Sequence, residues 1–211
     1  MKELVKQLLP PLLTELLKRA KYLRPHYFGL DNLDQKLERY LDFDGGYFVE
    51  LGANDGLHQS NTLYYERYRG WRGVLVEPIP HNYLLCRAHR SRDTHIFCNA
   101  CTSFDYKEKF VELVYSNLMS ASIGLESDVL DPFAHARRGK ILLGPTEANF
   151  VFGSPARPLN SILTEVNAPQ LIDFLSLDVE GAEIDVLKGI DHTGLDSCAS
   201  KIEVETSSFL S

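Results

Sequence analysis

An alternation of apolar and helical segments constrains the fold of this chain more than any other feature of its sequence. Three apolar segments of strand length alternate with two segments of helical pattern, in the order 47–53, 60–70, 73–78, 80–90 and 94–100. Strands that are joined through a helix lie parallel, with right-handed crossovers. The order predicts an α/β fold with a doubly wound, mostly parallel sheet.

The two expected helices have suitable ends. Ser60 or Asn61 can cap the first helix, and Gly70 can terminate it. Pro80 lies where the second helix begins, a position that tolerates proline because its N–H has no helical partner.

The rest of the chain is less regular. Residues 102–160 interrupt the alternation and are expected to form a variable insertion or substrate loop. Within it, 107–116 is expected to be an added strand or hairpin arm, and 124–158, rich in Gly and Pro, a long loop. The alternation resumes with a helix, a strand, a helix and a strand expected at 158–166, 173–179, 181–190 and 201–205.

The first 44 residues predict a helical arm that precedes a domain of residues 45–211. Leucines recur at helical spacing up to Leu17, and residues 1–40 are expected to be helical, with a break at Pro10 and Pro11. The apolar face is expected to pack on the domain or on a second subunit, which would make the chain a homo-oligomer. Binding to a membrane surface is the weaker alternative, because few cations flank the apolar face.

Charge and composition exclude several classes of protein. The net charge is −7 and no run of basic residues is longer than a pair, which argues against a nucleic-acid partner. No apolar run reaches the ~18 residues of a membrane span, and no signal peptide is expected. Cys98 and Cys101 form one C-x-x-C without a second pair, so we expect reduced thiols and a cytoplasmic protein.

The loop after the first expected strand, in VELGANDG, has the layout of a nucleoside site. Gly52 and Gly56 bracket a tight loop between a strand and a helix. Glu77 follows Gly56 by 21 residues, at the end of the second strand, where an acid can accept hydrogen bonds from both ribose hydroxyls.

The charge of this loop distinguishes between two cofactors. It lacks the full G-x-G-x-x-G and carries Asp55, with Glu50 just before it. Carboxylates beside the pyrophosphate of NAD would cost about 1–4 kcal/mol at ~4 Å. S-adenosylmethionine (SAM) has a ribose together with an ammonium and a sulfonium group, so SAM suits the loop better.

Four stretches together resemble the FkbM family of SAM-dependent methyltransferases: FVELGANDGLHQSNT, GWRGVLVEP, the Asn99-Ala100 pair and FLSLDVEGAEIDVLKGID. The resemblance extends over residues 47–205. It implies a Rossmann-like class I methyltransferase fold with seven strands, and O-methylation of a hydroxyl on a sugar, glycan, polyketide or related metabolite.

The resemblance also implies roles for individual residues. Glu77 resembles the ribose-binding acid, and Asn99 and Ala100 lie where the adenine is expected. The remaining cofactor-binding positions are Glu50, Gly52, Asn54 and Gly56 in the loop, and Ser60, Asn61 and Thr62 at the start of the helix, where an anionic carboxylate is favoured.

The chain departs from the family pattern at two places. The family fold continues after the fifth strand with a helix and an antiparallel hairpin, whereas this sequence ends at Ser211, so the C-terminal strands are expected to be missing or supplied by a partner. Asn160 stands where the family often has Asp.

The catalytic candidates follow the fourth core strand. Asp178 is expected at the switch point where open α/β sheets bind ligands. If the strand continued to Glu180, both acids would lie on one face and could share a proton as a general base, or hold Mg²⁺. Glu183 is as well explained as a first-turn helix acid. His58 is the best-placed histidine for an alternative base, because imidazole accepts a proton near neutral pH.

Two alternative functions remain open at this stage. The chain could be a non-catalytic SAM-fold module that acts in binding or assembly, or an NAD-dependent oxidoreductase, which the acidic loop disfavours. No motif in 102–160 names the acceptor.

Overall fold

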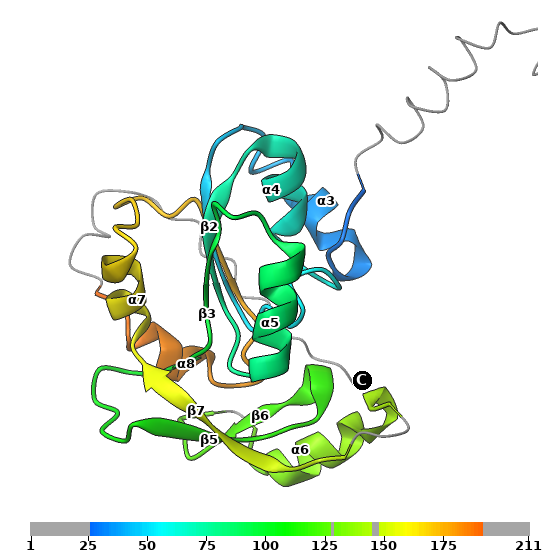
Figure 1. Cartoon of the computed structure of the whole chain (residues 1–211), viewed down its shortest axis with the longest axis vertical. Helices are drawn as coiled ribbons and strands as arrows, with labels where there is room; N and C mark the ends of the chain where they lie inside the picture. Colours follow the sequence, from blue (N-terminus) through cyan, green and yellow to red (C-terminus); the bar gives the residue numbers. More distant parts are fainter. Residues whose placement is uncertain (1–25, 128, 145–147, 192–211) are drawn as a thin grey trace, which may run out of the picture.

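The computed structural model describes residues 26–127, 129–144 and 148–191, and shows a mixed α/β arrangement of two sheets (Figure 1). The first sheet has the order β3-β2-β1-β8, and all its strands are parallel. The order reverses direction at β1, as the sequence predicts for a doubly wound sheet. Its strands are β1 (Tyr47–Leu51), β2 (Arg72–Val76), β3 (His95–Phe97) and β8 (Phe174–Leu177).

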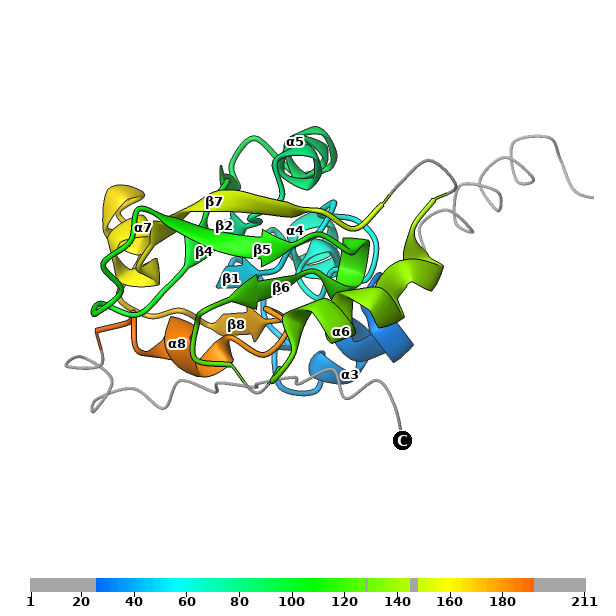
Figure 2. The ribbon, with the colours of Figure 1, turned by 90° about the horizontal axis from the view of Figure 1, so that it is seen from below.

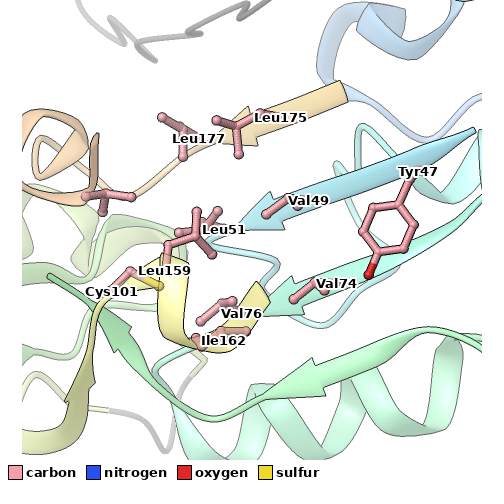
Figure 3. Close-up of a cluster of buried hydrophobic side chains, with 11 residues drawn as sticks. Tyr47, Val49, Leu51, Val74, Val76, Cys101, Leu159, Ile162, Leu175 and Leu177 are labelled. Atoms are coloured by element: carbon pink, nitrogen blue, oxygen red, sulfur yellow. The ribbon is translucent and has the colours of Figure 1, made fainter. Parts of the chain in front are cut away.

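Helices cover both faces of the first sheet, because its strands are apolar on both sides. On one face, α7 (Leu159–Glu165) and α8 (Glu183–Leu187) pack on alternate strand residues. Figure 3 shows Leu159 and Ile162 of α7 beside Leu51 and Val76. Successive side chains of a strand point to opposite faces of the sheet, so Leu51 and Val76 lie on this face and their neighbours along each strand lie on the other.

The opposite face is covered by α4 (Leu63–Arg69), α5 (Pro80–His89) and the short α3 (Leu33–Leu37). Phe48, Leu75 and Phe174 pack there against aromatic side chains of α4. Both expected helices of this face are confirmed: α5 begins at Pro80, and Gly70 ends α4 in the left-handed conformation, with φ +63°.

A second sheet lies across the carboxyl ends of the first (Figures 1 and 2). Its order is β4-β7-β5-β6, with β5 antiparallel to both of its neighbours. The strands are β4 (Ala100–Cys101), β5 (Phe110–Val114), β6 (Ala121–Ile123) and β7 (Val151–Arg157), with α6 (Pro132–Arg138) and 3-10 turns at Asn117–Met119 and Gly139–Leu142.

The expected loop over 124–158 is therefore wrong. Its Gly and Pro residues do not prevent β7 from forming: Gly153 pairs with Glu112 within the ladder with β5, and Pro155 pairs with Phe110 at the end of that ladder. Pairing with a distant segment, which sequence pattern does not encode, decided this element. The strand expected over 107–116 is confirmed as β5.

The expected third strand, 94–100, divides between the two sheets. Its first part pairs with β2 as β3, while Ala100 pairs with Ala156 of β7. The chain thus crosses from one sheet to the other at Cys98 and Asn99.

The N-terminal expectation is corrected where it can be compared. Between residues 26 and 44 the only helical elements are a 3-10 turn, Leu30–Asn32, and α3, rather than a helix that continues to residue 40. Asp31 and Asn32 have positive φ and interrupt the helix there. Residues 1–25, and the strands expected from residue 201 onward, lie outside the described residues, within which no helix is long and apolar enough to cross a membrane.

Candidate functional site

A cavity, here named the main cavity, lies between the two sheets, at the carboxyl ends of β1, β2 and β8. Its volume is about 90 Å³, within a larger space of about 720 Å³ that opens to solvent. The first sheet contributes Gly52, Glu77 and Asp178, and the second contributes Leu113, Ser120 and Ser122. A smaller cavity adjoins it beside Glu50, His58 and Ser60–Asn61, and shares Gly52, Asn54, Leu118 and Asp178 with it.

Gly52 allows β1 and β8 to approach each other at the base of the cavity. Its φ is +75°, and a Cβ there would lie 1.8 Å from the carbonyl oxygen of Asp178. Only glycine fits this close approach without a shift of the backbone.

Glu77 is a deeply buried acid of the site. It is 3% exposed, and its two carboxylate oxygens accept hydrogen bonds from the N–H groups of Asn54 (2.8 Å) and Ile79 (2.9 Å). Burial raises its pKa from the ordinary value of 4.5 to about 8, and the nearby charge of Asp178 adds to the rise. Hydrogen bonds from these two N–H groups and from the Asn82 side chain oppose the rise.

Asn54 and Gly56 shape the loop around Glu77. Asn54 has φ +49°, and its side-chain oxygen accepts a hydrogen bond from Asn82 at 2.9 Å. Gly56 has φ +72°, and a Cβ there would lie 3.1 Å from Cys86. The loop is thereby held against α5.

Glu50 is 4% exposed and is held within the protein. Its carboxylate accepts hydrogen bonds from the N–H of Asn61 (3.0 Å) and the hydroxyls of Ser60 (3.1 Å) and Thr62 (2.6 Å), and pairs with Arg90 (3.2 Å). These contacts fix the loop that leads into α4.

Arg90 is a residue that sequence reasoning missed. Its side chain is fully buried, and its guanidinium also bonds to Glu66 (3.0 Å) and the Thr62 hydroxyl (2.8 Å). The sequence offered no signal for it, because Arg90 lies at the end of an ordinary helix and its partners are 24 to 40 residues away.

The residues expected to start the first helix lie one turn before α4, which begins at Leu63. The Ser60 hydroxyl accepts a hydrogen bond from the N–H of Leu63 at 3.1 Å, as a capping residue does. Asn61 donates to the Ser176 hydroxyl at 3.1 Å, and its side-chain oxygen is buried with no partner among the described residues.

Asn99 and Ala100 line the main cavity at the opposite end from Asp178's loop, where the chain enters the second sheet. The side-chain amide of Asn99 donates to the carbonyl oxygen of Pro155 at 3.0 Å. This contact ties the cavity wall to β7.

The structure corrects the expected register of Asp178 and Glu180. The strand β8 ends at Leu177, and Glu180 has φ +52°, so alternation along a strand does not relate the two acids. Both nevertheless line the main cavity. The carboxylate of Glu180 contacts His135 Nε2 of α6 at 2.8 Å.

His58 and Glu183 are tied to their own loops. His58 is 75% exposed at its side chain and contacts the carboxylate of Asp55 at 2.5 Å. Glu183 is buried in the first turn of α8, where its carboxylate accepts hydrogen bonds from the N–H groups of Val179 and Gly181. Within the described ranges, no group of three or more His, Cys, Asp or Glu is arranged to hold a metal ion.

Comparison with known proteins identifies the family. The model of the methyltransferase FkbM domain matches residues 50–211, which confirms the resemblance seen in the sequence motifs. No curated protein and no solved structure matches the chain. Members of the family are methyltransferases and generally use SAM. The matched region contains the loop after β1, the catalytic candidates Asp178, Glu180 and His58, and the second sheet, and the chain therefore belongs to the FkbM methyltransferase domain family.

Proposed function

We propose that the chain is a SAM-dependent O-methyltransferase whose acceptor is a hydroxyl of a small molecule, such as a sugar or secondary metabolite. The observation that carries the proposal is the buried carboxyl group of Glu77 in a cavity that Asp178 also lines. The family supports methyl transfer, and the cavity supports a nucleoside-containing cofactor.

The residues present fit SAM. Both oxygens of Glu77 are oriented by backbone N–H groups, which suits a carboxyl group that accepts hydrogen bonds from vicinal ribose hydroxyls. The acids around the loop favour a ligand with a sulfonium and an ammonium over one with a pyrophosphate. Asn99 and Ala100 would flank the adenine, and Ser60–Asn61 with Gly52 would border the methionine part.

When bound, SAM supplies an electrophilic methyl group on its sulfonium. The chain's contribution is to place an acceptor hydroxyl in line with that methyl and to accept the hydroxyl proton as the new O–C bond forms. We assign proton acceptance to Asp178, which lines both cavities. His135 would orient Glu180 as its neighbour on the acceptor side.

Mg²⁺ remains an expectation from the sequence, and no step of this mechanism is assigned to a metal ion. His58 remains an alternative base beside the smaller cavity.

Titration calorimetry with S-adenosylhomocysteine (SAH) tests the cofactor. We expect wild-type protein to bind SAH, Glu77→Ala to lose binding, and Glu112→Ala, an exposed acid of β5, to retain it. If the folded protein does not bind SAH at millimolar concentration, the result would contradict the proposal and support a non-catalytic module. A thermal shift with NAD and none with SAH would favour an oxidoreductase instead.

Turnover tests the base. Asp178→Asn should lower SAH formation from SAM by at least about 100-fold, the usual contribution of a general base, while SAH affinity stays within about twofold. Equal losses of affinity and turnover would reassign Asp178 to cofactor holding.

A further inference from the structure

Ser122 of β6 carries a buried hydroxyl whose hydrogen-bonding needs the described residues do not meet. The residue is 7% exposed, and its Oγ has no partner. Buried hydroxyls are nearly always hydrogen-bonded in native proteins, so a buried hydroxyl without a partner indicates that another group, such as a ligand, completes its hydrogen bonding. Ser122 lines the main cavity, and so does Leu113, its cross-strand partner on β5.

A buried hydroxyl without a hydrogen-bond partner does not by itself indicate a ligand site, as Ser154 of β7 shows. It is 1% exposed and also lacks a partner, but it does not line the cavity. The distinguishing property of Ser122 is that its hydroxyl belongs to a side chain on the cavity wall, where a ligand can supply the missing hydrogen bond.

The position of β6 places Ser122 on the acceptor side rather than the adenine side. In the second sheet, β6 is the edge strand opposite β4, which carries Ala100. The helix α6 packs on β6, and its His135 contacts Glu180. Figures 1 and 2 show β6 beside α6.

The charge of the cavity limits the acceptor. Glu77, Asp178 and Glu180 line it, and no Lys, Arg or His is among its described lining residues. A phosphate or carboxylate on the acceptor would meet repulsion from Asp178 and Glu180 without a compensating cation among these lining residues.

We propose that Ser122 binds the methyl acceptor and that this subsite takes an uncharged alcohol rather than a phosphate ester or a carboxylic acid. The proposal rests on the function proposed above, because it places the acceptor next to a bound SAM. It adds a specificity-determining residue, and it assigns recognition of the acceptor to the second sheet.

The test uses tritium transfer from methyl-labelled SAM to two matched sets of acceptors: glucose, glucose 6-phosphate and glucuronate, and glycerol, glycerol 3-phosphate and glycerate. We expect labelling of an uncharged member and at least tenfold less of its charged partners. Labelling mainly of the charged members, or of no uncharged member, overturns the proposal.

Two variants separate acceptor binding from structure. Ser122→Ala should raise KM for the uncharged acceptor about 3- to 10-fold, the factor that one neutral hydrogen bond contributes, with an unchanged Kd for SAH. Ser154→Ala should change neither quantity, and both variants without ligand should melt no lower than wild type, since each loses only an unsatisfied hydroxyl.

An equal rise in KM for both variants, or a weaker Kd for SAH in Ser122→Ala, would overturn the assignment of Ser122 to the acceptor. Failure of the wild-type protein to bind SAH would instead overturn the proposed function on which the inference rests.

Discussion

Replacement of Glu77 by Gln should destabilise the protein at low pH and stabilise it at high pH. The folded chain holds the pKa of Glu77 at about 8, against 4.5 for an ordinary glutamate, mainly because burial penalises the charge. Folded protein therefore retains a proton on Glu77 that unfolded protein has lost. Between pH 4.5 and 8 this group makes the stability of wild type fall as the pH rises, by about 1.4 kcal/mol per pH unit.

The size of the effect follows from these two pKa values. Their difference, at 1.36 kcal/mol per pH unit, corresponds to a loss of about 5 kcal/mol by pH 8. Gln carries no charge and avoids that loss. Its amide nitrogen, however, replaces one of the two oxygens that accept backbone N–H groups, which costs about 1–3 kcal/mol at every pH.

Glu77→Gln should thus be less stable than wild type by about 1–3 kcal/mol at pH 4, and more stable by about 2–4 kcal/mol at pH 9. Urea unfolding across this range measures the difference, and other titrating groups cancel in the comparison. Glu112→Gln, an exposed site on β5, should differ from wild type by less than about 0.5 kcal/mol throughout. A pH-independent difference for Glu77→Gln would refute the raised pKa.

The same carboxyl group links cofactor binding to protons. A ribose needs Glu77 as an acceptor at both oxygens, which favours the ionised form, so SAH binding below pH 8 should release a proton. Calorimetry in buffers of different ionisation enthalpy would detect the release in wild type, and no release is expected in Glu77→Gln.

Three further variants test other parts of the site. Gly52→Ala should cost more than about 3 kcal/mol because its Cβ would meet a backbone oxygen at 1.8 Å, whereas Gly45→Ala, with the same φ of +75° in open space, should cost about 1–2 kcal/mol; equal losses in chemical denaturation would contradict this. Arg90→Ala leaves a buried acid unpaired and should lower the free energy of unfolding by about 3–5 kcal/mol, so a loss below 1 kcal/mol would show that the network does not stabilise the loop. His135→Ala should lower turnover about 10- to 100-fold with unchanged SAH affinity, and a matching loss of both would contradict its role on the acceptor side.

Local sequence signals predicted the first sheet and its helices well. Apolar segments of strand length alternate with helices there, and residues with a clear conformational preference bound the two helices, with Gly70 at the end of α4 and Pro80 at the start of α5. Spacing along consecutive strands also brought Gly52 and Glu77 to one cavity, because parallel strands present their carboxyl ends at the same edge.

The second sheet escaped prediction because its stability comes from non-local pairing. Strand β7 contains Gly153 and Pro155, both poor strand residues by themselves, and forms through its ladder with β5 some forty residues earlier. The same limit applied to Asp178 and Glu180, since β8 ends at Leu177 and the strand register on which their relation depended does not reach them.

The sequence by itself determined the parallel α/β core, the family, and the loop and acid expected to hold the cofactor, because short-range pattern and motif spacing carry that information. Only the tertiary structure decided which side chains face the cavity. It buried Arg90 against Glu50, set Glu180 against His135, and placed an unpaired hydroxyl of Ser122 in the wall, since each of these relations joins residues that are far apart in the chain.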